Sequence, residues 1–183
     1  MSIVKNPIQK FCIVCGSPVE FKIPDDDNKE RAVCTVCGHI HYQNPKVVSG
    51  CILEWEDKIV LCKRATEPRS GYWTLPAGFL ENNETVAEGA LRETLEEANA
   101  KSDSISLFYM CDLRHISQIY MMYLGKLLDG KYSPGPESEE VELFSESEIP
   151  WDDKAFTVIE KTLRLYYEDK KKGNFSIHFD TID

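Results

Sequence analysis

Three glutamates lie close together in one short segment and could bind a divalent cation. Glu93, Glu96 and Glu97 fall within five residues of a segment that the pattern predicts to be helical. At a separation of about 6 Å and an effective dielectric constant of about 20, each pair of carboxylates repels by about 3 kcal/mol. A cation such as Mg²⁺, which prefers oxygen ligands, would offset this repulsion. The alternative is a solvated acidic face, but no lysine is interleaved and a glycine-containing loop precedes the segment.

Four of the seven cysteines form two close pairs. The pairs are Cys12 with Cys15 and Cys34 with Cys37, separated by 18 residues. A glycine follows each pair and permits the tight turn that directs backbone amides at the sulfurs. This spacing is typical of a zinc ribbon, so we expect a structural Zn²⁺ with four thiolate ligands. We expect His39 and His41 to pack beside this site, and the segment 20–31 between the pairs to form a hairpin or loop.

A capping box positions the glutamates. Thr85 and Glu88 have the spacing of an N-cap and its partner, so we expect a helix over 86–98. Helical periodicity predicts that one face packs and that the glutamates, with Gly89, lie on the other. The predicted packing face consists of Ala87, Ala90, Leu91, Thr94, Leu95 and Ala98.

Runs of β-branched and apolar residues predict the strands around this helix. We expect strands over 47–55 and 58–63 joined by a turn at Glu56, and an extended piece over 72–76 that leads into a loop. A strand is indicated over 141–144, and a helix over about 153–169 covers the sheet. Residues 173–183 alternate apolar and polar side chains, which leaves both an added strand and a loose tail open. Three further cysteines lie in apolar runs and are expected to be buried: Cys51, Cys62 and Cys111.

Composition and charge exclude several classes of protein. A net charge of −10 argues against a general nucleic-acid-binding surface, and a polyanionic substrate would need local cations at its site. The apolar runs are shorter than the roughly 20 residues of a membrane helix, so we expect no membrane association. Residues 1–7 lack the pattern of a secretory leader, so we expect a cytoplasmic protein.

The segment around the glutamates resembles the Nudix box. The matching residues are Gly78, Glu84, and the run Arg92-Glu93-Thr94-Leu95-Glu96-Glu97-Ala98-Asn99-Ala100. Asn99 stands where that family usually has glycine, which is tolerable because asparagine can adopt the left-handed conformation that ends a helix. Thr94 replaces the usual aliphatic residue. Neither departure touches a carboxylate.

The resemblance implies a fold and a metal site. The fold would be α/β, an α/β/α sandwich with a mixed sheet over 45–172, preceded by a small β zinc ribbon over 1–44 and followed by a C-terminal tail over 173–183. Glu93 and Glu97 would be the main ligands of Mg²⁺ or Mn²⁺, with Glu96 assisting and the Ala77 carbonyl completing the site. Glu84 and Arg92 would form an ion pair that joins loop to helix.

The ribbon extends the resemblance to the NADH pyrophosphatase lineage. Tyr42-Gln-Asn-Pro-Lys46, Ser133-Pro-Gly-Pro-Glu-Ser138 and Leu143-Phe144 are similar to ribbon-bearing hydrolases that act on FAD or ADP-ribose. The NADH enzymes carry a proline-rich motif downstream of the box, whereas residues 108–123 contain no proline here. This departure lowers the NADH assignment. The family also leads us to expect a homodimer.

Other residues are candidates for contact with substrate. Diphosphate hydrolysis needs a further carboxylate from a loop, as a catalytic residue and Mg²⁺ ligand, and we favour Glu137, with Glu140 as the alternative. Arg64 and Arg69 could bind phosphate, or form surface ion pairs. Trp73, like its neighbours Tyr72 and Phe79, could stack on a base, although aromatic residues at strand ends are more often core residues.

We therefore expect a metal-dependent hydrolase that cleaves the diphosphate linkage of ADP-ribose or FAD and releases AMP. Within the enzyme class the alternatives are NADH, CoA derivatives and a capped RNA end. From another class comes an inactive zinc-ribbon module that senses a nucleotide, but the intact set of carboxylates on residues 93–97 argues against it.

Overall fold

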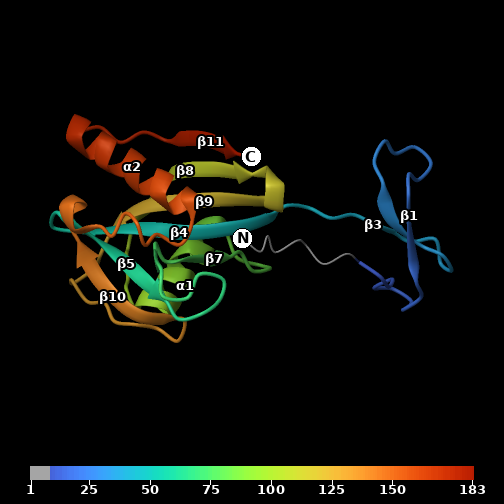
Figure 1. The fold of residues 1–183 in the computed structure, drawn as a ribbon, viewed down its shortest axis with the longest axis horizontal. Coiled ribbons are helices and arrows are strands. Elements are labelled where there is room, and N and C mark those ends of the chain that lie inside the picture. The colour runs from blue at the N-terminus through green and yellow to red at the C-terminus, as the bar shows by residue number, and fades with distance from the viewer. Residues whose placement is uncertain (1–8) are drawn as a thin grey trace. The chain divides into compact units, whose positions relative to one another are not determined.

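The computed structural model describes residues 9–183, which divide into two compact units at the boundary between Pro45 and Lys46 (Figure 1). The prediction that the chain has no secretory leader concerns residues 1–7, which lie outside the described part. Neither helix in residues 9–183 has the length and apolar character needed to cross a bilayer. Each unit is built around its own set of strands.

The N-terminal unit is a three-stranded antiparallel sheet. It contains β1 (Val19–Lys22), β2 (Arg31–Cys34) and β3 (Ile40–His41), in the order β1-β2-β3. The segment between the cysteine pairs, for which a hairpin or a loop was open, forms a hairpin, because Lys22 pairs with Arg31 across β1 and β2. Asp27 organises the intervening turn, since its carboxylate accepts from the amides of Asn28 and Lys29 and from the side chain of Arg31.

The second unit is organised around a mixed sheet. Its strands are β4 (Lys46–Trp55), β5 (Lys58–Arg64), β6 (Trp73–Thr74), β7 (Ala77–Phe79), β8 (Ile105–Leu113), β9 (Gln118–Lys126), β10 (Ser138–Phe144) and β11 (His178–Ile182). The strand order is β10-β5-β4-β9-β8-β11, with β6 added to β5 and β7 added to β4. β4 runs parallel to β9 and β11 runs parallel to β8, while the other pairs are antiparallel. Short 3₁₀ turns cover Arg114–Ile116 and Glu146–Glu148.

Helices α1 (Val86–Ala98) and α2 (Thr157–Lys172) cover opposite faces of this sheet (Figure 1). The central strand β4 is buried on both sides: Ile52 belongs to the core under α2, while Cys51 and Leu53 belong to the core under α1. Two cores on the two faces of one mixed sheet make an α/β/α sandwich. The expected fold class is confirmed.

The tail helix begins four residues later than its periodicity predicts and ends three residues later, at Lys172. Residues before Thr157 extend along β6 instead, where Trp73 N donates to the Asp153 carbonyl and Ala155 N donates to the Trp73 carbonyl, both at 2.8 Å. These bonds hold the segment in an extended conformation that a helix cannot share. Gly173, with φ 67°, then ends the helix.

Two further predictions need correction or completion. Ala77–Phe79, which the sequence placed at the entry to a loop, forms strand β7 and pairs with Val48–Gly50 of β4. The segment 173–183, left open above, contributes β11, which pairs with Tyr109–Leu113 of β8. Cys51, Cys62 and Cys111 are buried as expected, and burial raises the pKa of the Cys51 thiol to about 11.

The face of α1 that packs against the sheet also differs from the prediction. Leu95 is 44% exposed, whereas Glu97 is 6% exposed and Gly89 is buried. The helix is rotated because β7 approaches it on the side that bears Glu93 and Glu97. Periodicity assigned hydrophobic residues to the interior, but here the backbone of β7 supplies a polar partner that makes a buried carboxylate tolerable.

Candidate functional site: a carboxylate cluster between α1 and β7

The capping box predicted from Thr85 and Glu88 is present and fixes the start of α1. Thr85 Oγ1 accepts a hydrogen bond from Glu88 N at 3.2 Å, and the Glu88 carboxylate accepts one from Thr85 N at 2.7 Å. At the other end Asn99 takes the left-handed conformation that the sequence required of it, with φ 46°. The helix is therefore defined at both ends, and the acidic residues on it have fixed positions.

Glu97 is a buried carboxylate held by strand β7. Its Oε2 accepts a hydrogen bond from Ala77 N at 3.0 Å. Burial raises the pKa of Glu97 to about 7; the hydrogen bond from Ala77 opposes this rise and the charge of Glu93 adds to it. A carboxylate with such a pKa is poorly compensated by the protein alone, and a cation bound to its second oxygen would favour the charged form.

Glu93 lies directly over Gly78 of β7. A Cβ atom on residue 78 would overlap the carboxylate of Glu93, so glycine is needed for this approach. Arg92 Nη1 donates to Glu93 Oε1 at 2.7 Å. Burial raises the pKa of Glu93, while that hydrogen bond opposes the rise. Gly78 thus forms a cradle for Glu93, that is, a place on β7 where the absence of a side chain lets this carboxylate approach. Glu93 and Glu97 therefore both lie against β7.

Arg92 connects the loop, the strand and the helix. Its Nε and Nη2 donate to the two oxygens of Glu84 at 3.0 and 2.8 Å, and Nη2 also donates to the Phe79 carbonyl at 3.1 Å. Nη1 reaches Glu96 Oε2 at 3.0 Å. The pairing of Glu84 with Arg92 that the resemblance implied is observed. Glu96 remains largely exposed, with 57% of its side chain accessible, and differs in this from Glu93 and Glu97.

The loop that bears Glu137 packs against the C-terminus of α1. Ser133 N donates to the Ala98 carbonyl at 2.8 Å, and Gly135 N donates to the Glu97 carbonyl at 3.0 Å. Glu137 is exposed, and its charge contributes to the raised pKa of Glu97. The structure therefore brings Glu137 into the electrostatic environment of the helix carboxylates.

The alternative loop carboxylate, Glu140, has a different environment. It lies on β10, and its Oε1 accepts from Lys63 Nζ at 2.7 Å. The third acidic residue of the segment, Glu139, lies 4.0 Å from the same lysine. Both carboxylates are therefore paired with Lys63 of β5 rather than with residues of α1.

The two arginines that could bind phosphate, Arg64 and Arg69, have separate environments. Arg64 donates to the Pro68 carbonyl at 3.0 Å, lies 5.4 Å from the ring centre of Phe156, and opposes the pKa rise of Glu97 through its charge. Arg69 lies 5.1 Å from the ring centre of Tyr72. Only Arg64 is linked to the carboxylate cluster by these observations.

Trp73 packs at the edge of the core under α2. Its ring lies edge-on to Phe144, with centroids 4.8 Å apart. This environment accounts for Trp73 as a packing residue, and base stacking by it stays a prediction. By contrast, Phe79 of β7 is 49% exposed, and Lys46 Nζ lies 4.9 Å from its ring centre.

Two contributions to the site were not visible in the sequence. Gly135 and Asn99 join the loop that bears Glu137 to α1. Gly135 lies far from the Nudix box in the sequence, and Asn99 stood out only as a departure from the usual glycine of the box. The Pro-Gly-Pro run at 134–136 was a signal of a fixed turn, but nothing local indicated that the turn contacts a helix end.

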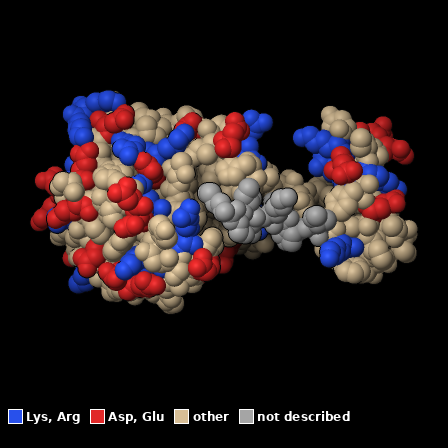
Figure 2. Space-filling view, in the orientation of Figure 1, with Lys and Arg blue, Asp and Glu red and all other residues tan. Residues whose placement is uncertain are grey.

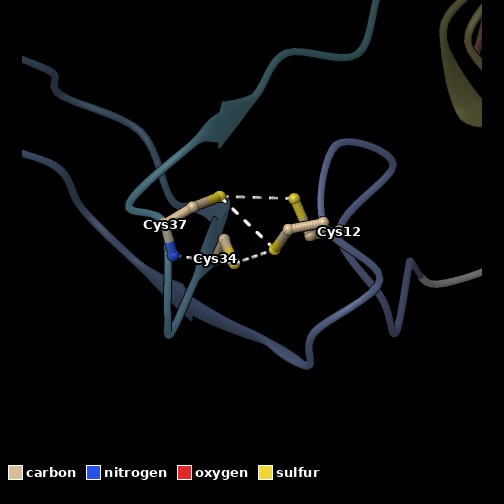
Figure 3. Close-up of side chains that lie close together, drawn as sticks. Cys12, Cys34 and Cys37 are labelled. Carbon is tan, nitrogen blue, oxygen red and sulfur yellow. Dashed lines mark hydrogen bonds between the residues drawn. The ribbon is translucent and has the colours of Figure 1, made fainter.

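The four cysteines of the N-terminal unit converge on one point (Figure 3). Their sulfurs all lie within 4.8 Å of one another, and three of the distances are 3.4, 3.5 and 3.7 Å. Tetrahedral Zn²⁺ with bonds of about 2.3 Å requires sulfurs about 3.8 Å apart. Amides of Val14 and Val36 point at Cys12 and Cys34, as the turn glycines predict. The donor set therefore fits a structural zinc ion.

The two histidines that follow the second cysteine pair pack against each other, and Cys34 N donates to the His39 carbonyl at 2.9 Å, which places His39 beside the cysteines as expected. The rings of His39 and His41 are edge-on with centroids 4.7 Å apart, and His41 is buried. Neither histidine belongs to the cluster that could hold the zinc ion, which consists of the four cysteines.

Comparison with known proteins identifies the family. A model described as NUDIX domain matches residues 44–166, and one described as Nudix N-terminal, a zinc ribbon, matches residues 10–43. A mixed sheet between two helices, with a capped acidic helix against a Gly-containing strand, agrees with this match. The chain belongs to the Nudix family, with an N-terminal zinc ribbon. Membership of this family supports hydrolysis of a nucleotide diphosphate linkage, and the domain implies a divalent metal for catalysis.

Three relatives define its neighbourhood. A NUDIX hydrolase of known structure from Nitrosomonas europaea is 54% identical, with a TM-score of 0.91 over 95% of this chain and 99% of that chain. An ADP-ribose pyrophosphatase from Methanocaldococcus jannaschii is 32% identical over 60% of this chain and 67% of its own length. An NAD-capped RNA hydrolase, NudC, from Photobacterium profundum is 30% identical over 70% of this chain, which spans only 47% of that protein.

Proposed function

We propose that this protein hydrolyses the diphosphate linkage of ADP-ribose or FAD and releases AMP. The observation that carries the proposal is the pair of buried or half-buried carboxylates, Glu93 and Glu97, facing strand β7 at a point where Gly78 leaves room for them. Support for the substrate class comes from the similarity to an ADP-ribose pyrophosphatase. The absence of proline in residues 108–123 favours these substrates over NADH.

A divalent cation fits this site by the chemistry of its donors. Glu93 and Glu97 would hold it, with Glu96 and the loop carboxylate of Glu137 assisting and the Ala77 carbonyl completing its oxygen ligands. Mg²⁺ or Mn²⁺ would supply positive charge to the diphosphate oxygens and acidify a bound water. The raised pKa values of Glu93 and Glu97 indicate carboxylates whose ionised forms the protein alone does not fully stabilise.

The residues of the chain divide the remaining tasks. Glu137, exposed on its loop and close enough to raise the pKa of Glu97, would accept a proton from the attacking water. Arg64, near Glu97, would bind a phosphate oxygen and provide charge that this acidic protein otherwise lacks at the site. Arg69 would bind the second phosphate, and Trp73 or the more exposed Phe79 would pack against the base. Glu84 and Arg92 would keep the loop against α1.

The alternative activity is hydrolysis of NADH or of an NAD-capped RNA end. It is favoured by the 30% identity to NudC, although this chain spans about half of that protein. Figure 2 shows acidic and basic side chains interspersed over the visible face, and the net charge of −10 disfavours binding along an RNA backbone. We therefore rank a small nucleotide above RNA as the substrate. The inactive nucleotide sensor is the other alternative.

A substrate panel tests the proposal. ADP-ribose, FAD, NADH and an NAD-capped oligonucleotide are incubated with Mg²⁺ or Mn²⁺, and AMP is measured by liquid chromatography. We expect kcat/KM for ADP-ribose or FAD to exceed that for NADH. Glu97→Gln should lower kcat by more than about a hundredfold, and Glu96→Gln by less, because Glu96 is exposed. Turnover of no substrate by the wild-type protein would favour the sensor, and full activity of Glu97→Gln would remove Glu97 from the site.

The homodimer and the cytoplasmic location stay predictions. Light scattering at micromolar concentration gives the mass in solution, to be compared with the 20.9 kDa of one chain.

A further inference from the structure

Asn99 ends helix α1 and also contacts the loop that precedes β10. Its backbone has φ 46°, and its amide N donates to the Leu95 carbonyl at 2.9 Å. Glycine would serve this C-cap role equally well. The side chain adds a second contact, because Nδ2 donates to the carbonyls of Ser133 and Pro134 at 3.3 and 3.0 Å. A glycine at this position could not make these two bonds.

The same loop satisfies the last carbonyls of the helix. Ser133 N donates to the Ala98 carbonyl and Gly135 N to the Glu97 carbonyl, at 2.8 and 3.0 Å. A Cβ atom on Gly135 would overlap the Glu96 carbonyl, so the backbone approaches as closely as glycine allows. The side-chain and backbone bonds together fix the loop against the final turn of α1.

Glu137 follows this contact by two residues. Its own carbonyl accepts from Ala65 N at 2.8 Å, at the end of β5, so the backbone of Glu137 is anchored on its far side as well. The charge of its carboxylate acts on both Glu93 and Glu97. The position of Glu137 relative to α1 therefore depends on how the preceding loop is held.

We infer that Asn99 is a positioning residue whose side-chain amide holds the loop 133–137 against α1 and so sets the distance of Glu137 from the metal-binding carboxylates. The inference rests on the proposed function, because it concerns the same cation site. Asn99 contacts the loop through its side-chain amide. Its effect is transmitted through Glu137, and it replaces a helix-ending glycine with a residue that also orders the loop.

Five variants test the role of Asn99. Asn99→Gly keeps the left-handed backbone and removes the side-chain amide, whereas Asn99→Asp places a carboxylate oxygen against the carbonyls of Ser133 and Pro134. Asn83→Gly is the matched control, since Asn83 also has a positive φ, 71°, and its side chain makes no hydrogen bond within residues 9–183. Glu137→Gln, alone and combined with Asn99→Gly, tests whether the two residues act together.

Mn²⁺ binding without substrate is measured by calorimetric titration, beside kcat, KM and Tm. We expect Asn99→Gly and Asn99→Asp to weaken Mn²⁺ binding by about tenfold and to lower kcat at limiting metal, as substitutions behind metal ligands do. The KM for ADP-ribose at saturating metal and the Tm should change little. Asn83→Gly should behave as wild type. In the Glu137→Gln background, Asn99→Gly should have almost no further effect on Mn²⁺ affinity.

Two results would overturn the inference while leaving the proposed function intact. One is Mn²⁺ affinity and kcat of Asn99→Gly equal to those of wild type. The other is a loss that adds fully to that of Glu137→Gln, which would mean that Asn99 acts on the helix and not through the loop. A wild-type protein that neither binds Mn²⁺ nor hydrolyses any nucleotide would instead refute the proposed function, and the inference with it.

Discussion

The guanidinium of Arg92 forms a bidentate ion pair with Glu84, in which Nε and Nη2 donate to separate carboxylate oxygens at 3.0 and 2.8 Å. Glu84 also accepts a hydrogen bond from Glu81 N at 2.7 Å. These bonds, led by the one from Arg92, hold the pKa of Glu84 at about 2, well below its ordinary value of 4.5. The pair joins the loop 80–85 to α1 through a hydrogen-bonded ionic contact that is only partly exposed to solvent.

This pair should contribute to stability in a defined pH window. A carboxylate with a lowered folded-state pKa stabilises the fold above its ordinary pKa of 4.5, and loses that contribution as the pH falls toward 2. We expect Glu84→Gln to lower Tm at pH 7 and the difference from wild type to shrink steadily between pH 5 and pH 2. The measurement is thermal unfolding by circular dichroism at each pH.

The control for this prediction is Glu142→Gln, an exposed residue of β10. Its Tm should stay close to that of wild type at every pH in the series. A difference between Glu84→Gln and wild type that is constant from pH 7 to pH 2 would mean that the amide disturbs packing and not charge.

The close approach of Gly78 to Glu93 gives a second prediction. Gly78→Ala places a methyl group where the Glu93 carboxylate lies, so the carboxylate must move. We expect kcat to fall by at least about tenfold, as for disturbed metal ligands, with the variant still folded. The kcat of Glu93→Ala should fall further than that of Gly78→Ala. The combination Gly78→Ala with Glu93→Ala should be no worse than Glu93→Ala alone, because the methyl group then has nothing to displace.

Steady-state kinetics and Tm of the four proteins complete this cycle. Additive losses in kcat would show that the methyl group acts elsewhere, for example on the pairing of β7 with β4. Unchanged kcat of Gly78→Ala at normal Tm would contradict the cradle itself.

The capping box and the cysteine spacing were predictable because each depends on residues close in sequence. The burial of Glu97 was not predictable, because it depends on the amide of Ala77, twenty residues away, in a segment whose local sequence predicts a loop and not strand β7. Helical periodicity weighs side chains by polarity and has no knowledge of a backbone donor on a neighbouring strand. Periodicity therefore predicts that Leu95 is buried, whereas the structure exposes it.

The limits of helix α2 and the fate of the tail have similar causes. Asp153 and Ala155 are drawn into extended pairing with Trp73, a long-range contact that outweighs local helical preference. Residues of β11 alternate apolar and polar side chains as a strand does, but a strand forms only where a sheet has a free edge to pair with. Here β8 provides that edge, which the local sequence does not show. The sequence shows that the loop bearing Glu137 is acidic. It does not show that this loop is attached to α1 through Asn99, because those contacts join residues that lie 34 and 35 positions apart.

Removal of zinc should act on the N-terminal unit alone. That unit has a small core, and four thiolates whose sulfurs lie within 4.8 Å of one another need a cation to offset their charges. We expect one zinc per chain by mass spectrometry, and Cys37→Ser or chelation should remove it. Hydrogen exchange at Arg31–Cys34 of β2 should then accelerate, while β4 and β9 remain protected. Retained protection of β2 without zinc would show that the ribbon folds without its metal.

The last strand should contribute stability without contributing to catalysis. Deletion of residues 174–183 removes β11 from β8, together with the stacking of Phe175 on Tyr166 and the 2.7 Å contact between His178 and Asp169. Lost apolar burial should cost about 2 kcal/mol, which corresponds to a fall in Tm of about 6 °C. All of these contacts lie at β8 or α2, whereas the carboxylates lie on α1 across the sheet. Well below the lowered Tm, kcat and KM should therefore match the full chain. Calorimetry and kinetics on both proteins check this, and a loss of kcat in the folded truncated protein would place β11 in the function of the site.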